Sequence, residues 1–158
     1  MGVTSIVETM RAIRLALIDE LLRAQNERQL LKTLDVEGLL ARAAGRDAFG
    51  AELRRLETQL HDEVGTLSDS LGGTRTIASL SARLGRDGAI LTTLLAEIRA
   101  LAASLRELDA LNASLAQRSL QVVRGYLQTL SPRAQQYTAR GAAVTQGGPT
   151  TSMQSARL

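Results

Sequence analysis

The clearest pattern in this chain is a seven-residue repeat of apolar positions that runs from Ile77 to Val122. Two positions of the repeat, three residues apart, carry mostly Leu and Ile. The first set reads Ile77, Leu84, Leu91, Ile98, Leu105, Asn112, Ser119 and Tyr126; the second reads Leu80, Asp87, Leu94, Leu101, Leu108, Leu115, Val122 and Thr129. Such a stripe follows one side of a helix and must pack against another helix.

The repeat changes toward its carboxy-terminal end. It is apolar through Leu108 and polar at Asn112 and Ser119. Four later apolar residues move onto other faces of the helix: Leu120, Val123, Leu127 and Leu130. We therefore expect the last turns of this helix to have a different neighbour from the first turns.

Two earlier segments, 3–34 and 36–71, also show helical periodicity. The apolar face of the first is Ile6, Met10, Ile13, Leu17, Leu21, Ala24 and Leu31. The apolar face of the second is Leu39, Ala43, Phe49, Leu53, Leu56, Leu60, Val64 and Leu67. Asp35 lies between these segments and is a suitable N-cap for the second helix.

Glycines divide the rest of the helical region. Gly72 and Gly73 end the second helix, and Thr74 or Thr76 can cap a short helix over 75–84. A long helix is expected over 87–130, before the stop at Pro132. The repeat keeps its phase across Gly85 and Gly88, so one continuous helix is also compatible with the sequence.

The predicted fold class is all-α, because Leu, Ala, Arg, Glu and Gln favour helices and alternating strand patterns are absent. We expect an elongated antiparallel bundle of three long helices with a short extra helix, occupying residues 1–132. Residues 133–158 are rich in Gln, Thr, Ser and Gly and show no apolar period. Such a segment buries too little apolar surface to order itself, so a disordered, flexible tail is expected.

Composition favours a cytoplasmic protein. The chain has no Cys, which excludes disulfides and thiolate metal sites and fits a reducing compartment. Residues 1–5 lack the basic start and apolar core of a secretory signal. No run approaches the roughly 18 apolar residues that a membrane helix needs, so we expect no membrane insertion.

The net charge of +3 does not indicate a nucleic-acid binder. Arg133, Arg140 and Arg157 supply all of it, and residues 1–130 hold 16 basic and 16 acidic residues. A nucleic-acid binder gathers its positive charges on one face. Here the two signs alternate along the helices, which is typical of a solvated surface.

Residues suited to catalysis or metal binding are sparse. His61 is the only histidine, has no second His or Cys to share a metal, and is expected to be solvated. The acidic pairs Asp19-Glu20 and Asp62-Glu63 are interpreted as surface charges. The glycines form neither a P-loop nor a dinucleotide fingerprint. We therefore expect no enzyme, no metal site and no cofactor.

Residues 108–141, LDALNASLAQRSLQVVRGYLQTLSPRAQQYTARG, resemble the FlgN family of flagellar export chaperones. The resemblance rests on Leu111-Asn112, Leu115, Arg118-Ser119-Leu120, Val122, Val123, Tyr126, Leu127 and Leu130, then a Pro stop and Tyr137-Thr138-Ala139-Arg140-Gly141. The amino-terminal half agrees more loosely, at Leu21-Leu22, Glu27, Leu30-Leu31 and Asp35-x-Glu37.

The resemblance implies a cytoplasmic, non-catalytic chaperone of the flagellar type III export apparatus. Its partners would be the hook-filament junction proteins, also called hook-associated proteins. The chaperone would bind the carboxy-terminal amphipathic helix of this cargo, keep the cargo unassembled and present it to the export gate. Helix-in-groove recognition suits that task, because an unassembled cargo helix exposes an apolar stripe in the cytosol.

The candidate cargo contacts lie in the last part of the long helix: Asn112, Leu115, Val122, Val123, Tyr126 and Leu130. Asn112 either bonds a partner backbone or fixes the register inside the bundle, as single buried Asn residues do in coiled coils. Four of the candidate contacts either form a surface groove or pack on the start of the first helix: Val122, Val123, Tyr126 and Leu130. Tyr137 either docks on an export component or folds back onto the bundle.

Two other classes of protein remain open. One is a self-associating coiled-coil structural protein, whose stripe is closed by a second copy. The other is a helical adaptor or regulator in bacterial signalling, which would have no affinity for cargo helices. A free chaperone is expected to be a monomer or a weak dimer.

Overall fold

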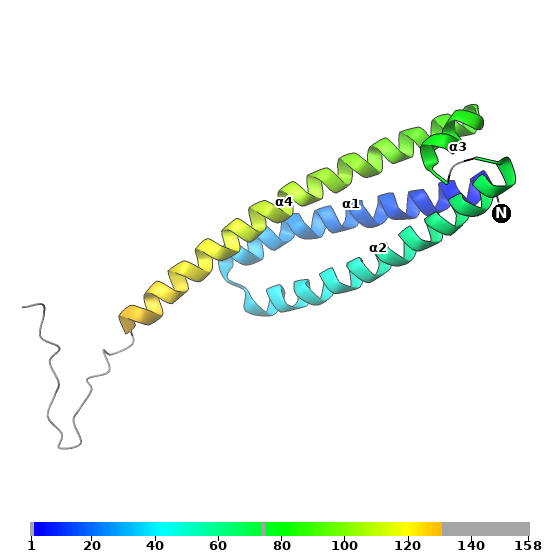
Figure 1. Ribbon diagram of the computed structural model, residues 1–158. Helices are drawn as coiled ribbons and strands as arrows, with labels where there is room; N and C mark the ends of the chain where they lie inside the picture. The colour runs from blue at the N-terminus through cyan, green and yellow to red at the C-terminus, as the bar shows by residue number, and fades with distance from the viewer. Residues whose placement is uncertain (1, 74, 131–158) are drawn as a thin grey trace, which may run out of the picture. The chain divides into compact units, whose positions relative to one another are not determined.

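The computed structural model describes residues 2–73 and 75–130, which form helices joined by short connections. The helices are α1 (Val3–Thr33), α2 (Val36–Leu71), α3 (Ile77–Arg83) and α4 (Arg86–Leu130) (Figure 1). The described residues contain no strand. The predicted class, all-α with three long helices and a short one, is confirmed. The predicted tail at 133–158 lies outside the described residues.

The chain divides into two compact units, Met1–Leu120 and Gln121–Leu158. The first unit contains α1, α2, α3 and α4 as far as Leu120. The described part of the second unit is the end of α4, residues 121–130. The predicted boundary at residue 132 stays a prediction.

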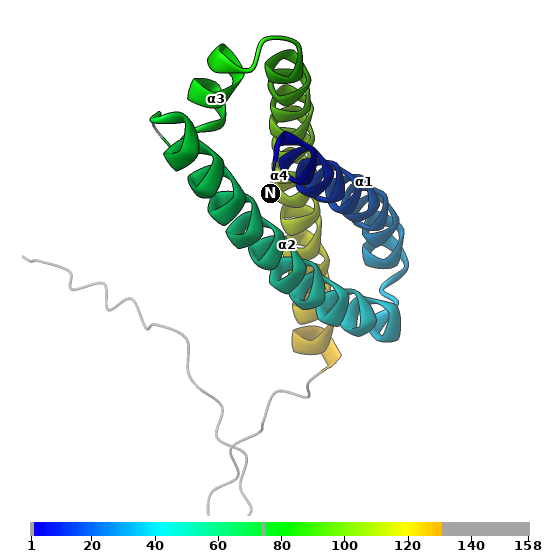
Figure 2. The ribbon, with the colours of Figure 1, turned by 90° about the vertical axis from the view of Figure 1, so that its right-hand side faces the viewer.

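Within the first unit, α2 runs antiparallel to α1, and α4 runs in the direction of α1 (Figure 1). The short helix α3 lies where α2 ends and α4 begins, and both views place it there (Figures 1 and 2). The up-down-up order follows from two short connections at opposite ends of the unit. It brings the apolar faces of α1, α2 and α4 together.

The connection between α1 and α2 is tight because two caps share it. Leu34 takes a left-handed conformation, φ 53°, after α1. The side chain of Asp35 accepts a hydrogen bond from the backbone N–H of Gly38 at 2.9 Å, so it is the N-cap predicted from the sequence. A Cβ atom at Gly38 would lie 2.8 Å from both Asp35 Oδ2 and Leu30 Cδ2. Only glycine fits this corner without displacing its neighbours.

The connection from α2 to α4 contains the short helix. Gly72 ends α2 with φ 63°, and the Thr76 hydroxyl caps α3 by accepting from the N–H of Ser79 at 3.1 Å. Gly85 has φ 54°, so α3 and α4 are separate helices rather than one continuous helix. Gly88 is buried, and a Cβ atom there would overlap the backbone carbonyl of Ser81 in α3.

The core of the first unit has two apolar clusters. One joins the start of α1 to the end of α2, to α3 and to the start of α4 through Ile6, Val7, Met10, Val64, Leu80, Leu91 and Leu94. The other joins the middle of the three long helices through Ile13, Leu17, Ala24, Leu56 and Leu105. These are mainly the faces predicted from periodicity, although Ala43 is exposed. Burying each large side chain contributes about 1.5–3 kcal/mol.

Helix α4 is long and apolar enough to cross a membrane by length and composition alone. The expectation of no membrane insertion was based on unbroken apolar runs, and the finding does not conflict with it. The finding is weak evidence for insertion, because the core helix of a soluble protein passes the same test. Leu91, Leu94 and Leu105 of α4 are core residues of the first unit.

Candidate functional site

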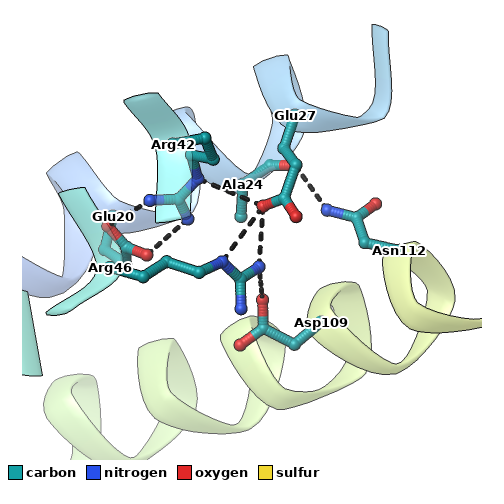
Figure 3. A network of polar contacts seen from close by, with 7 residues as sticks. All are labelled: Glu20, Ala24, Glu27, Arg42, Arg46, Asp109 and Asn112. Atoms are coloured by element: carbon teal, nitrogen blue, oxygen red, sulfur yellow. Dashed lines mark hydrogen bonds and ion pairs between the residues drawn. The ribbon is translucent and has the colours of Figure 1, made fainter. Parts of the chain in front are cut away.

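Asn112, the first of the predicted contacts, is buried in the first unit with 2% of its surface exposed. Its Nδ2 donates a hydrogen bond to the backbone carbonyl of Ala24 in α1 at 2.8 Å (Figure 3). Among the described residues its buried Oδ1 has no partner. Of the two roles open to Asn112, its position matches the fixing of helix register, because a slide of α4 along α1 breaks this bond.

A network of charged side chains lies beside Asn112 and links α1, α2 and α4 (Figure 3). Arg42 of α2 donates two hydrogen bonds to the carboxylate of Glu20, and its Nε donates to Glu27 at 3.1 Å. Arg46 donates to Glu27 at 2.7 Å and to Asp109 of α4 at 2.6 Å. Two arginines of α2 therefore bind carboxylates of the two other long helices.

Burial and pairing act in opposite directions on the guanidinium of Arg46. Burial alone would lower its pKa, but the hydrogen bonds and charges of Glu27 and Asp109 raise the pKa above its ordinary value. Arg42 and Glu20 are almost completely buried, with 7% and 4% of their side chains exposed. A buried charge requires a partner, because leaving either one unpaired costs far more than an exposed pair contributes. The network thus makes the three long helices depend on one another.

The structure corrects two interpretations of acidic residues. Glu20 is buried in the network, and Glu63 is also buried, whereas both were expected to be surface charges. Oε1 of Glu63 accepts hydrogen bonds from Ser5 at 2.6 Å and from Gln59 at 3.0 Å. Burial alone would raise the pKa of Glu63, but hydrogen bonds from Ser5, Gln59 and Thr9 lower it below its usual value. His61 is exposed, as expected.

The end of α4 differs from the buried polar network, because its large apolar side chains are exposed to solvent. We call the side chains Val122, Tyr126, Leu127 and Leu130 the exposed apolar strip; their exposed fractions are 57%, 67%, 61% and 75%. Successive residues of a helix are turned by about 100°, so these four side chains fall within about 140° of its circumference, on one side of the helix. Side chains this accessible are not core residues. Water-exposed apolar surface concentrated on one face is typical of a protein interaction site.

The other predicted contacts vary in accessibility. Leu115, in the first unit, and Val123, in the second, are partly buried. Leu127 was not among the predicted contacts, although its place one turn after Val123 on an apolar helix face could have indicated it. Tyr137 lies outside the described residues. The strip therefore contains three predicted contacts and one additional leucine.

The described residues offer little for catalysis or metal binding. They contain no group of three or more His, Cys, Asp or Glu side chains arranged to hold a metal ion. The buried carboxylates of Glu20 and Glu63 are bonded to neighbouring helices, which is a structural use. The accessible surface at the end of α4 is apolar instead, at the four side chains of the exposed apolar strip.

Comparison with known proteins identifies the family of the chain. The family model described as FlgN protein matches residues 1–145. No curated protein and no solved structure matches the chain. The matched range contains α1 to α4 and the exposed apolar strip, and the family is one of chaperones rather than enzymes. The chain therefore belongs to the FlgN family of cytoplasmic flagellar export chaperones.

Proposed function

We propose that this chaperone binds the carboxy-terminal amphipathic helix of hook-filament junction proteins, keeps these proteins unassembled and delivers them to the export gate. The exposed apolar strip is the observation that carries the proposal. An unassembled junction protein has an apolar helix face that is later buried in the polymer. Covering that face with the strip removes apolar area of both partners from water, which is the main driving force for such contacts.

The test is a titration of the full-length chain with synthetic peptides that span the terminal helices of junction proteins. We expect a defined complex and a negative heat-capacity change on binding, which marks apolar burial. The double variant Tyr126→Ser/Leu130→Ser should weaken binding by about tenfold or more, because each large apolar contact contributes about 1–3 kcal/mol. Leu22→Ser is the matched control, since Leu22 is a similarly exposed leucine on α1. Equal affinity of all three proteins would exclude the strip as the binding surface.

The free chain is proposed to be a monomer or a weak dimer that converts to a complex with its cargo. Sedimentation velocity with and without peptide separates this state from a stable self-associated coiled coil. A tight dimer that persists and excludes the peptide would favour the structural alternative. A monomer that binds none of the junction-protein peptides would favour the alternative of an adaptor or regulator protein.

We further propose that Tyr137 docks the loaded chaperone on an export component. An aromatic residue among the Gln, Thr, Ala and Gly of this segment has few apolar neighbours in sequence. Tyr137→Ala should leave cargo affinity unchanged and reduce export, with the two quantities measured separately. Export at the normal rate would exclude this role.

A further inference from the structure

The exposed apolar strip is bordered by positive charge on both sides. With about 100° between successive residues of a helix, Arg118 and Arg124 fall on opposite borders of the face that carries the strip. Both arginines are exposed. Neither makes an ion pair within the ranges that the structure describes. The apolar face and its two cationic borders thus form one surface feature of α4.

The acidic residues of the chain end before this feature begins. Asp109 is the last Asp or Glu in the sequence, and residues 110–130 contain Arg118 and Arg124 as their only charged residues. Asp109 itself is paired with Arg46. The helices α1 and α2 and the earlier part of α4 carry both signs, so the end of α4 differs from them in having charge of one sign.

This distribution of charge separates the candidate occupants of the strip. A second copy of the chain, seated strip to strip, would bring only arginines to the borders, in either helix direction. Like charges facing each other across a helix pair destabilise it. A helix with carboxylates at its borders gains ion pairs instead, as the border positions of coiled coils do. Charge complementarity therefore favours an acidic partner over self-association.

We infer that the strip selects amphipathic helices whose apolar face is bordered by Asp or Glu. This inference rests on the proposed function and specifies the chemistry of its cargo helix. The strip supplies the affinity, while Arg118 and Arg124 discriminate among helices of equal apolar area. Discrimination of this kind is electrostatic, so it weakens as salt is added.

The experiment uses two synthetic amphipathic peptides with the same apolar face, one bordered by Glu and the other by Lys. Each is titrated into the full-length chain at low and at high salt. The Glu-bordered peptide should bind about tenfold more tightly at low salt, because two exposed ion pairs replace two repulsive contacts. The preference should shrink toward equality at high salt.

A charge exchange localises the effect. The variant Arg118→Glu/Arg124→Glu should prefer the Lys-bordered peptide. The control Arg11→Glu/Arg23→Glu makes the same change in net charge at exposed positions of α1 and should keep the preference for Glu. Equal binding of both peptides, or a preference that survives the exchange, would overturn the inference and leave the strip as a binding surface. Binding of neither peptide would overturn the proposed function as well.

Discussion

Two regions of α4 use side chains in opposite ways. Around Asp109 and Asn112, in the first unit, polar and charged side chains meet carboxylates, arginines and a carbonyl of α1 and α2. From Val122 to Leu130, in the second unit, large apolar side chains are exposed to solvent. In the first region polar groups bind the helices to one another, and in the second region apolar side chains remain accessible to solvent. The difference shows that one helix contributes polar contacts to the bundle in one region and leaves apolar area accessible in another.

The largest expected effect comes from breaking the charged network. Arg42→Ala leaves Glu20 buried without its partner and should lower the free energy of unfolding by about 3–5 kcal/mol. Urea denaturation followed by far-ultraviolet circular dichroism measures the change. Arg55→Ala is the control, because Arg55 pairs with Glu52 on the exposed surface of α2. Losing this exposed pair should leave the free energy of unfolding nearly unchanged. A small effect at Arg42 would mean that the network is not needed for stability.

A smaller effect is expected at the other buried carboxylate. Ser5→Ala removes the 2.6 Å hydrogen bond to Glu63 and should cost about 1–2 kcal/mol near neutral pH. The pKa of Glu63 is lowered in the folded protein, so its contribution is present above the ordinary value of 4.5 and is lost as pH falls through the folded value. The difference between wild type and variant should therefore narrow in acid.

Unfolding measurements from neutral pH to pH 3 test this dependence. Ser70→Ala serves as the control, because the Ser70 hydroxyl donates only to the backbone carbonyl of Leu67. A Ser5→Ala penalty that stays constant down to the lowest pH would show that Glu63 does not carry it.

The smallest effect on stability is expected from substitutions in the exposed apolar strip at the end of α4. Tyr126→Ser and Leu127→Ser should change the free energy of unfolding by no more than about 0.5 kcal/mol, because both side chains are exposed. Leu105→Ala, in the buried part of the same helix, should cost about 2–5 kcal/mol. Strong destabilisation by the serine variants would show that the strip is covered in the folded protein.

Much of the fold was predictable because its determinants are local. The seven-residue repeat, the cap at Asp35 and the glycines at 72 and 85 each act within a few positions of the chain. Periodicity therefore located the core faces, including Leu91 and Leu105. These signals need no knowledge of which helices become neighbours.

The errors concern residues whose environment is set by distant parts of the chain. Glu20 is paired with Arg42, and Glu63 with Ser5, which lies 58 positions away. In sequence, both acids look like members of a charged helix surface. The role of Asn112 stayed open for the same reason, since its contact with Ala24 spans 88 positions. The accessibility of residues 122–130 depends on which elements pack against the helix. The apolar pattern of the sequence does not predict those neighbours.

The buried Gly88 sets a limit on how relatives of this chain can vary. Its missing side chain is what lets the backbone of α4 approach the carbonyl of Ser81 in α3. Even alanine there must push the two backbones apart. A homologue with any other amino acid at this position should therefore have a hairpin of altered length or course between its second and last long helices.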